Sequence, residues 1–493
     1  MIPDATRDFA HSREFTESQA PKQIMNPSNS DSFRGNLSFD PTRRCFVLSD
    51  KATLLKRETF TAHYGAVPVS GPWILQADLG FTTPDPEAAA GIHFQRSHDP
   101  ESVFVTARFS GEGSASIAFR SEDNGPVQQI HCGGKHFESI QMELKDDRII
   151  LQGAHPGEEW QVLGSIRMQI PASGHVGLFV QHPDPANFLC AGFRNVRLTL
   201  PAPAGFRPYK DYIGSRLEIL HLQGFTRETV FETPDGIEAP NWTPDGRSLI
   251  YNSKGLLFRF DLQTRTPSQI DTGFAIANNN DHGISPCGKW LALSHHRADR
   301  DPGADSSVYI VPIEGGIPKL VTDLSPSYWH AWSPDGTHLI YTGGRSGQYD
   351  IYTIPIEGGP ETNLTNHPML DDGADYSADG KWIYFNSLRT GTMQIWRMRP
   401  DGSEPEQITF DSFNDWFPHP SPDGKWIVFL SYSPDIPFGD HPYYRHVMIR
   451  IMPASGGAPR VIARLYGGQG TINVPSWAPD SRSLAFVSHT NHL

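Results

Sequence analysis

The sequence predicts an all-β protein of two parts, an antiparallel β-sandwich of the jelly-roll type followed by a six-bladed β-propeller. Short runs of alternating apolar and polar residues, separated by Gly, Pro, Asp and Asn, fill residues 31–201. A turn motif then recurs six times at intervals typical of one propeller blade. No helical pattern of useful length intervenes, and 493 residues are too many for one ordinary domain.

The part of the chain before the repeats divides into an arm, a sandwich and a linker. Residues 1–30 are polar and aperiodic, so we expect a flexible N-terminal arm there. Runs such as "PWILQADLGF" and "GHVGLFVQH" within 31–201 have the length and alternation of sandwich strands. The stretch "PAPAG" at 201–205 breaks this pattern, which predicts a linker over 202–214.

The turn motif of the second part is Ser-Pro-Asp-Gly in its commonest form. Its six copies are spaced by 42, 48, 44, 44 and 57 residues and begin at Thr243, Ser285, Ser333, Ser377, Ser421 and Ala478. Pro presets φ and Gly accepts a positive φ, which suits the hairpin between the first two strands of a blade. The last copy leaves room for one strand only, while two unassigned strands stand at 215–234. We therefore expect residues 215–493 to close a ring by pairing both ends in one blade.

These motifs, with "NLT" and "IPIEGG" between them, resemble the TolB-like family of six-bladed propellers over residues 215–493. The resemblance implies the fold and leaves the function open, since such propellers also serve as interaction domains and as accessory domains of peptidases. No GxSxG motif follows the propeller, which argues against a peptidase. Residues 31–201 resemble sandwiches of the concanavalin or laminin-G type, many of which bind glycans.

Composition excludes several classes of function. A formal net charge of −14 argues against a nucleic-acid or anionic-membrane partner. The four cysteines lie far apart, so neither a zinc ribbon nor a disulfide framework is expected. "LYGGQGTIN" lacks the Lys-Ser/Thr of a phosphate loop, and we expect no nucleotide or organic cofactor. Without a visible signal peptide or membrane span, the predicted location is cytoplasmic, or periplasmic if a leader has been removed.

One face of the predicted propeller carries many titratable and aromatic side chains. The loops from the last strand of a blade to the next blade open on this face, as do the loops between second and third strands. Ahead of two turn motifs, His282 and His330 replace a proline of the ordinary repeat, and His419 lies one place later in a third. We expect these side chains to converge on the mouth of the central channel.

A metal site is the first interpretation of this face. Imidazole and carboxylate ligands suit one divalent ion, manganese or zinc in class, or calcium. The predicted ligands are His282, His330, His419 and Asp372. The alternative is that these histidines hydrogen-bond between blades and never meet.

Acid–base chemistry is the second interpretation. His330, His419 and Tyr444 can carry protons, and Arg345 or Arg389 can clamp a carboxylate, as β-elimination from a uronic acid requires. The stretch "FPHPSPDG" at 417–424 is similar to a segment of oligogalacturonate lyases, which are manganese-binding propellers with seven blades. That similarity implies a metal or site role for His419 alone.

Sugar recognition is the third interpretation. Flat aromatic faces suit a pyranose ring, and amides and carboxylates suit its hydroxyl groups. The predicted substrate-binding residues are Asn280, Tyr328, Trp329, Asp372, Trp416, His441, Tyr443, Gln469 and Asn473. The alternative for the aromatic residues is packing between blades.

Together these patterns predict a carbohydrate-active enzyme, a lyase or glycoside-cleaving enzyme acting on oligosaccharides at the mouth of the channel with possible help from a metal. The alternative is a non-enzymatic TolB-like propeller that binds a protein, peptide or glycan. A docking face should expose apolar and aromatic anchors. A catalytic mouth should instead bring titratable groups close together.

Overall fold

The computed structural model describes residues 36–40, 45–49, 63–81, 87–133, 137–169, 173–181, 190–207 and 210–491. The regular elements of this part of the chain are β-strands, which confirms the all-β prediction. No helix among these residues has the length and apolar character needed to cross a membrane. The chain forms two compact units, Met1–Pro201 and Ala202–Leu493. The predicted arm over 1–30 lies outside the described residues.

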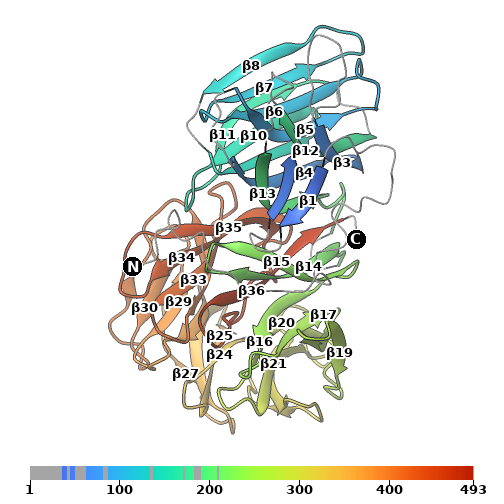
Figure 1. Cartoon of the computed structure of the whole chain (residues 1–493). Helices are drawn as coiled ribbons and strands as arrows, with labels where there is room; N and C mark the ends of the chain where they lie inside the picture. Colours follow the sequence, from blue (N-terminus) through green and yellow to red (C-terminus); the bar gives the residue numbers. More distant parts are fainter. Residues whose placement is uncertain are drawn as a thin grey trace. The chain divides into compact units, whose positions relative to one another are not determined.

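The N-terminal unit consists of two antiparallel sheets (Figure 1). The seven-stranded sheet has the order β1 (Asn36–Asp40), β2 (Cys45–Ser49), β13 (Cys190–Thr199), β4 (Trp73–Phe81), β9 (Ser139–Lys145), β10 (Arg148–Ala154) and β11 (Gln161–Arg167). The six-stranded sheet has the order β3 (His63–Ser70), β12 (Ser173–Gln181), β5 (Ala89–Gln95), β6 (Phe104–Ser110), β7 (Ala115–Arg120) and β8 (Gln128–Gly133).

Both sheets of this unit contribute to one hydrophobic core. Trp73 and Leu75 of β4 are buried in the same cluster as Ile92 and Phe94 of β5. The rings of Trp73 and Phe94 stack with centroids 5.6 Å apart. Alternate residues of β4 and β5 enter the core, the pattern expected of facing antiparallel sheets. The resemblance to a concanavalin or laminin-G sandwich stays a prediction.

The C-terminal unit contains six small antiparallel sheets among the described residues. One has three strands, β15 (Thr226–Thr233), β14 (Gly214–His221) and β36 (Ser483–Thr490). The next two are β16 (Glu238–Trp242), β17 (Ser248–Ser253), β18 (Leu256–Asp261), β19 (Thr266–Ile270), and β20 (Asn278–Ile284), β21 (Trp290–His296), β22 (Ser306–Pro312), β23 (Lys319–Leu320).

The remaining three sheets repeat the same order. They are β24 (Ser327–Trp332), β25 (His338–Arg345), β26 (Gln348–Pro355), β27 (Thr362–Asn363); β28 (Asp371–Tyr376), β29 (Ile383–Ser387), β30 (Gln394–Met398), β31 (Glu406–Gln407); and β32 (Asn414–Pro420), β33 (Trp426–Tyr432), β34 (Arg445–Pro453), β35 (Arg460–Gly467). Strand β36, red in Figure 1, pairs antiparallel with the green β14, so the two ends of the unit share one sheet.

The turn motif has a physical reason to recur. Ser333 donates from its hydroxyl to Oδ1 of Asp335 at 2.6 Å, and that oxygen also accepts the N–H of Thr337 at 3.0 Å. Gly336 takes a φ of 72°, which a side chain would disfavour. The Ser–Asp bond recurs at Ser377 and Ser421, so one local device starts the second strand in several sheets.

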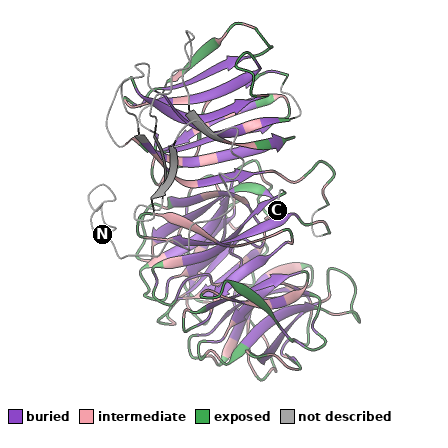
Figure 2. Cartoon of the chain, turned by 45° about the vertical axis from the view of Figure 1, so that its right-hand side comes forward, coloured by how far each residue is buried: buried purple, intermediate pink, exposed green. Residues whose placement is uncertain are grey.

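Neighbouring sheets are joined by apolar packing and by tryptophan hydrogen bonds. Trp332 donates from Nε1 to the carbonyl oxygen of Gly283 in the preceding sheet at 3.0 Å, and Trp477 donates to that of His419 at 2.8 Å. Figure 2 shows the resulting burial: the strands of the unit are largely purple, while most turns are pink or green. These bonds tie the first strands β20, β24 and β32 to their neighbours, which makes them rigid supports for functional side chains.

Candidate functional site

Four titratable side chains from four successive sheets interact at their first strands. We call them the first-strand cluster. Its members are Glu238 of β16, Asp281 of β20, His330 of β24 and Asp372 of β28. Glu238, Asp281 and His330 are buried, and Asp372 is half-buried. The charge of Asp281 is influenced by the other three, so the cluster is one electrostatic unit.

The closest contact in the first-strand cluster is the ion pair between His330 and Asp372. Nε2 of His330 donates to Oδ1 of Asp372 at 2.9 Å, and the same oxygen accepts bonds from Thr342 Oγ1 at 2.6 Å and Gly373 N at 2.8 Å. Burial by itself disfavours both charged forms. The pairing outweighs burial, raising the pKa of His330 and lowering the pKa of Asp372 to about 2. Asp372 is therefore ionised at neutral pH.

Glu238 and Asp281 are held differently. Burial raises the pKa of each carboxyl group to about 7, and no arginine or lysine among the described residues pairs with either. Tyr443 donates from its hydroxyl to Oε1 of Glu238 at 2.5 Å. This hydrogen bond acts to lower the pKa of Glu238, against the larger effect of burial. Two carboxyl groups that titrate near neutral pH thus lie beside one that stays ionised. Buried groups perturbed in this way are candidates for acid–base chemistry.

A β-bulge interrupts the first strand of each of five sheets. The pairing register shifts between Glu238 and Asn241, Asn278 and His282, Trp329 and Ala331, Asp372 and Asp375, and Trp416 and His419. Two non-glycine residues in these bulges take a positive φ, Ala239 at 55° and Phe417 at 56°. Bulges re-aim side chains and are frequent beside active sites, and the first-strand cluster lies on them.

The segment between β33 and β34 contributes further side chains. Besides Tyr443 it supplies His441, whose charge helps to lower the pKa of Asp372. The ring of His441 lies 4.5 Å from the buried ring of Trp416, edge to face. Nδ1 of His441 and Nε1 of Trp416 are buried without a hydrogen-bond partner in the described part of the chain. Two predicted substrate-binding residues, His441 and Tyr443, therefore lie beside the first-strand cluster. A third, Trp416, contacts the ring of His441.

The loop before β36 closes another side of the site. Asn473 donates from Nδ2 to Oε1 of Gln469 at 2.9 Å and accepts the N–H of Gly470 at 2.7 Å. The main chain of Asn473 also helps to raise the pKa of His330. Asn473 is buried and Gln469 is half-buried. These two predicted substrate-binding residues hold the loop together next to the first-strand cluster.

Two histidines of the predicted metal set have other partners. His419 is buried, with Nδ1 3.1 Å from Oδ2 of Asp375 and Nε2 2.8 Å from the carbonyl oxygen of Ile472. His282 is buried, with Nδ1 3.0 Å from the carbonyl oxygen of the buried Asn280. Burial lowers the pKa of His282 to about 4. His419 thus links three parts of the unit, and both of its ring nitrogens are occupied.

The structure therefore brings together only His330 and Asp372 of the predicted metal set. Among the residues that the structure describes, no group of three or more His, Cys, Asp or Glu side chains is arranged to hold a metal ion.

Both predicted arginine clamps are committed to their own sheets. Arg345 makes two 2.8 Å hydrogen bonds to the carboxylate of Glu361, from Nε and Nη2. Arg389 donates from Nη2 to Oδ2 of Asp371 at 2.8 Å. Clamping a substrate carboxylate would require breaking one of these half-buried pairs, which is costly.

The other predicted residues lie mainly in packing positions. The hydroxyl of Tyr444 accepts the N–H of Ile213 at 3.3 Å. Trp329 is 1% exposed and covers Gly283, where an added Cβ would lie 2.0 Å from the indole. Tyr328 is half-buried, and burial raises the pKa of its hydroxyl, with the charge of Asp281 adding to the effect. Burial likewise raises the pKa of the Tyr444 hydroxyl, with the charge of Glu238 adding to the effect, so Tyr328 and Tyr444 both sense the first-strand cluster.

Sequence reasoning did not assign a role to Glu238 or Asp281. Glu238 stands five places before the turn motif at Thr243, and Asp372 stands five places before the motif at Ser377. Comparing blades at equal distance from the motif, rather than looking for histidines, would have brought Glu238 into the set. The burial of these acids without a basic partner has no signal in the sequence.

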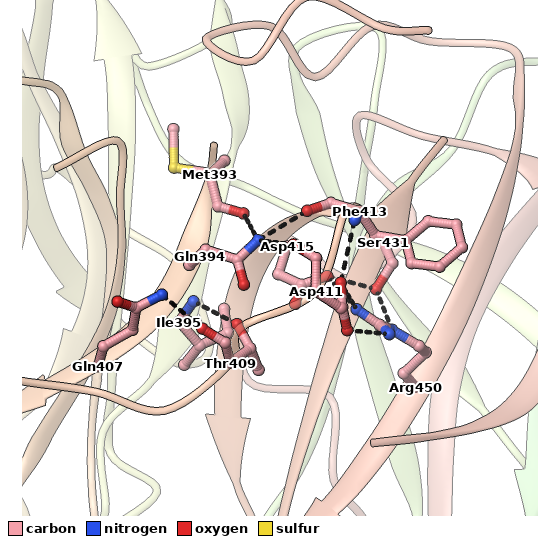
Figure 3. A network of polar contacts seen from close by, with 10 residues as sticks. All are labelled: Met393, Gln394, Ile395, Gln407, Thr409, Asp411, Phe413, Asp415, Ser431 and Arg450. Carbon is pink, nitrogen blue, oxygen red and sulfur yellow. Dashed lines mark hydrogen bonds and ion pairs between the residues drawn. The ribbon is translucent and has the colours of Figure 1, made fainter. Parts of the chain in front are cut away.

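Asp415, next to Trp416 in sequence, belongs to a different buried network (Figure 3). Arg450 donates from Nη2 to Oδ1 of Asp415 at 2.5 Å and from Nη1 to Oδ2 of Asp411 at 2.7 Å. Its Nε donates to the hydroxyl of Ser431 at 2.7 Å, and that hydroxyl donates to Asp415 at 2.8 Å. We call Arg450, Asp411, Asp415 and Ser431 the arginine network. It ties β32, β33 and β34 together with the loop that precedes them.

Comparison with known proteins identifies the family. The TolB β-propeller domain matches residues 302–438. An uncharacterized protein of Agrobacterium fabrum is 48% identical over 276 residues, which are 56% of this chain and 92% of that protein. The chain belongs to the TolB-like β-propeller family.

Solved structures agree with a TolB-like propeller. A structure from Agrobacterium tumefaciens assigned as a TolB is 47% identical with a TM-score of 0.54, covering 57% of this chain and 99% of that chain. An oligogalacturonate lyase in complex with manganese is 14% identical with a TM-score of 0.39, covering 56% of this chain and 83% of that chain. Similarity as low as the latter is no basis for assigning chemistry to this TolB-like protein.

Proposed function

We propose that this TolB-like protein is a carbohydrate-active enzyme that cleaves glycosidic bonds, with the first-strand cluster as its acid–base centre. One observation carries the proposal: successive sheets bring three carboxyl groups and an imidazole into one electrostatic unit, with carboxyl pKa values driven apart. An enzyme of this type needs one carboxyl group that holds a proton and another that is ionised. We also infer that the six sheets form a closed six-bladed ring around this centre.

The roles follow from the environments of the groups. Glu238 or Asp281, titrating near neutral pH, donates a proton to the leaving glycosidic oxygen. Asp372 keeps its negative charge and stabilises the positive charge that develops on the sugar ring. Water then attacks the ring carbon and gives up a proton to the conjugate base of the donor, which restores the acid. His330 holds Asp372 in that state through the 2.9 Å hydrogen bond. Tyr443 positions Glu238 through its hydroxyl.

Between the two reaction types predicted from the sequence, glycoside hydrolysis is better supported than elimination from a uronic acid. Elimination needs a cation that neutralises the substrate carboxylate. The arginines predicted for this task are paired with Glu361 and Asp371. A uronate would instead meet the carboxyl groups of the first-strand cluster, which repel it.

The alternative, a docking propeller, finds less support at this site. A docking face depends on exposed aromatic anchors. At the first-strand cluster, the exposed fractions of Trp329, Trp416, Tyr443 and Tyr444 are 1%, 0%, 6% and 3%, and Tyr328 is half-buried. The exposed aromatic residues of the unit, such as Phe274 and Phe410, are not members of this cluster. The cytoplasmic location predicted from the sequence is part of this proposal. Cell fractionation checks it.

The test is a search for products with the full-length protein. It is incubated with a panel of neutral, amino and uronate oligosaccharides, and new reducing ends are measured by mass spectrometry. Whichever of Glu238→Gln and Asp281→Asn removes the proton donor should reduce cleavage by about 100-fold or more, because a positioned proton donor contributes about that much. Glu357→Gln is the matched control, since Glu357 is exposed and pairs only with an exposed lysine.

Three outcomes would count against hydrolysis. Products that carry a new double bond would show elimination instead. Binding of an oligosaccharide without any product would favour the docking alternative. Equal activity of Asp281→Asn, Glu238→Gln and the control would remove the first-strand cluster from the mechanism.

A further inference from the structure

The first-strand cluster holds more acid than base. Three carboxyl groups, those of Glu238, Asp281 and Asp372, are coupled to one imidazole inside it. Its single ion pair is His330 with Asp372, and the charge of His441 also acts on Asp372. The charge of His330 acts on Asp281 as well, but neither Glu238 nor Asp281 has an ion-pair partner in the described residues. Gathering carboxyl groups in a buried place is unfavourable unless a positive charge joins them.

A second, independent feature is an unpaired hydrogen-bonding atom on His330. This side chain is 3% exposed and spends Nε2 on Asp372. Its Nδ1 atom is buried and makes no hydrogen bond of normal geometry to the described residues, although the main chain of Asn473 lies beside it. A buried polar atom left unpaired costs about 1–3 kcal/mol. The site therefore offers one donor, Nδ1–H, beside two carboxyl acceptors.

We propose that the sugar bound at the first-strand cluster is an amino sugar, with a primary ammonium group next to a hydroxyl group. The inference rests on the proposed function and specifies its substrate class. An ammonium group has three N–H donors and no acceptor. Its N–H groups donate to the carboxyl groups of Glu238 and Asp281. The neighbouring hydroxyl oxygen then accepts the free N–H of His330.

The same charges exclude the other common sugar classes. A uronate carries a carboxylate and is repelled by the acidic groups. An N-acetylated sugar has lost the ammonium charge and two of its three N–H donors, so it leaves one carboxyl group unpaired. A neutral hexose replaces the ammonium with a hydroxyl, which forms weaker bonds to a carboxylate than a charged donor does. The geometry thus ranks the amino sugar first.

Isothermal titration calorimetry at neutral pH and low salt tests this ranking. The probes are the disaccharides of glucosamine, N-acetylglucosamine and galacturonic acid, each titrated into the full-length protein. The glucosamine disaccharide should bind about tenfold or more tightly than the N-acetylated one, and the galacturonate should give no detectable heat. Asp281→Asn should reduce the preference about tenfold. Glu357→Gln, which changes an exposed acid, should leave it unchanged.

The outcomes separate this inference from the proposed function. Cleavage of N-acetylated oligomers without preference for the amino form would overturn the inference and keep the enzyme. A preference for the amino form without cleavage of any oligomer would keep the inference and overturn the enzyme. A lysine-containing peptide that binds as tightly as the disaccharide would overturn the sugar assignment. The comparison among ligands uses the unmodified protein, so it stands even if a variant fails to fold.

Discussion

The arginine network and the first-strand cluster bury similar side chains in the same propeller but balance their charges differently. In the arginine network, two carboxylates share one guanidinium whose three nitrogens all have partners. In the first-strand cluster, three carboxyl groups share one imidazole whose Nδ1 is unpaired. A satisfied polar network stabilises a single arrangement of strands. A cluster with unbalanced charge costs stability, which indicates that it is retained for binding or chemistry.

The contrast has one exception inside the arginine network. Oδ2 of Asp415 is buried without a partner, and burial raises the pKa of this group to about 6. Arg450 and Ser431 both work to lower it. The unpaired oxygen faces a network that already contains its cation, so we read Asp415 as a structural residue.

The largest effect is expected from breaking the arginine network. Arg450→Met should destabilise the protein by about 3–5 kcal/mol, because it leaves Asp411 and Asp415 as buried or half-buried carboxylates without a cation. Urea denaturation measures the loss. Lys319→Met, which removes an exposed pair, should cost about 1 kcal/mol or less. Equal losses in the two variants would contradict a structural role for the network.

Removing the charge of Asp281 from the first-strand cluster should instead stabilise the protein at high pH. Burial raises the pKa of Asp281 from 3.8 to about 7, so between these values the folded state binds more protons than the unfolded state. Its contribution therefore makes the protein less stable as pH rises through that window. Asp281→Asn should remove this loss and increase stability at about pH 8 relative to about pH 5 by about 2–3 kcal/mol.

Urea denaturation of both proteins at the two pH values checks this prediction. Asp305→Asn provides the control, because the carboxylate of Asp305 accepts a hydrogen bond from the exposed His296 and lies outside the cluster. A variant that is less stable than the parent at the higher pH would show that the charge of Asp281 has a partner in the fold.

Much of the propeller could be predicted because its signal is local. The Ser333–Asp335 hydrogen bond and the positive φ of Gly336 are made within four residues, so the turn motif reads directly from the sequence. The site could not be read in the same way. The carboxylate that holds Arg345 is Glu361, which lies just before β27 of the same sheet and 16 residues further along the chain. His419 bonds to Asp375, in another sheet altogether.

The period of the turn motif therefore predicted which loops carry the site residues. It did not predict which side chains these residues bond to. Two aromatic or basic residues can share a loop while one packs and the other faces a ligand. Glu238 was missed for a different reason. Its blade keeps the proline of the ordinary repeat, so no functional residue was expected there, yet its carboxyl group belongs to the first-strand cluster. The partner of a side chain is decided by packing between sheets, which a single sequence does not contain.

A smaller effect tests whether Trp329 belongs to the scaffold. In Gly283→Ala the new Cβ would lie 2.0 Å from the indole of Trp329, so the ring or the strand must shift. Overpacking of this kind costs about 1–3 kcal/mol. Gly439→Ala is the matched control, since no atom lies within 4 Å of its added Cβ and its φ is not positive. Thermal unfolding compares the two, and an unaffected Gly283→Ala would free Trp329 for a ligand role.

The smallest effect concerns the bond between Tyr443 and Glu238. The Tyr443 hydroxyl favours the charged form of Glu238, so Tyr443→Phe should raise the pKa of Glu238 further above its ordinary value. If Glu238 donates the proton in catalysis, activity should then persist to higher pH, by about one pH unit or about 1 kcal/mol. The pH profile of kcat/KM measures the shift. Tyr251→Phe, a buried tyrosine outside the cluster, should leave the profile in place.

A purely structural Tyr443 would lower the melting temperature without moving the alkaline limb of that profile. If instead the acidic limb moves to higher pH, the charged form of Glu238 is the active one, and Asp281 is then the proton donor. The limb that moves thus assigns the two acids of the first-strand cluster, because the hydrogen bond from Tyr443 reaches Glu238 and not Asp281.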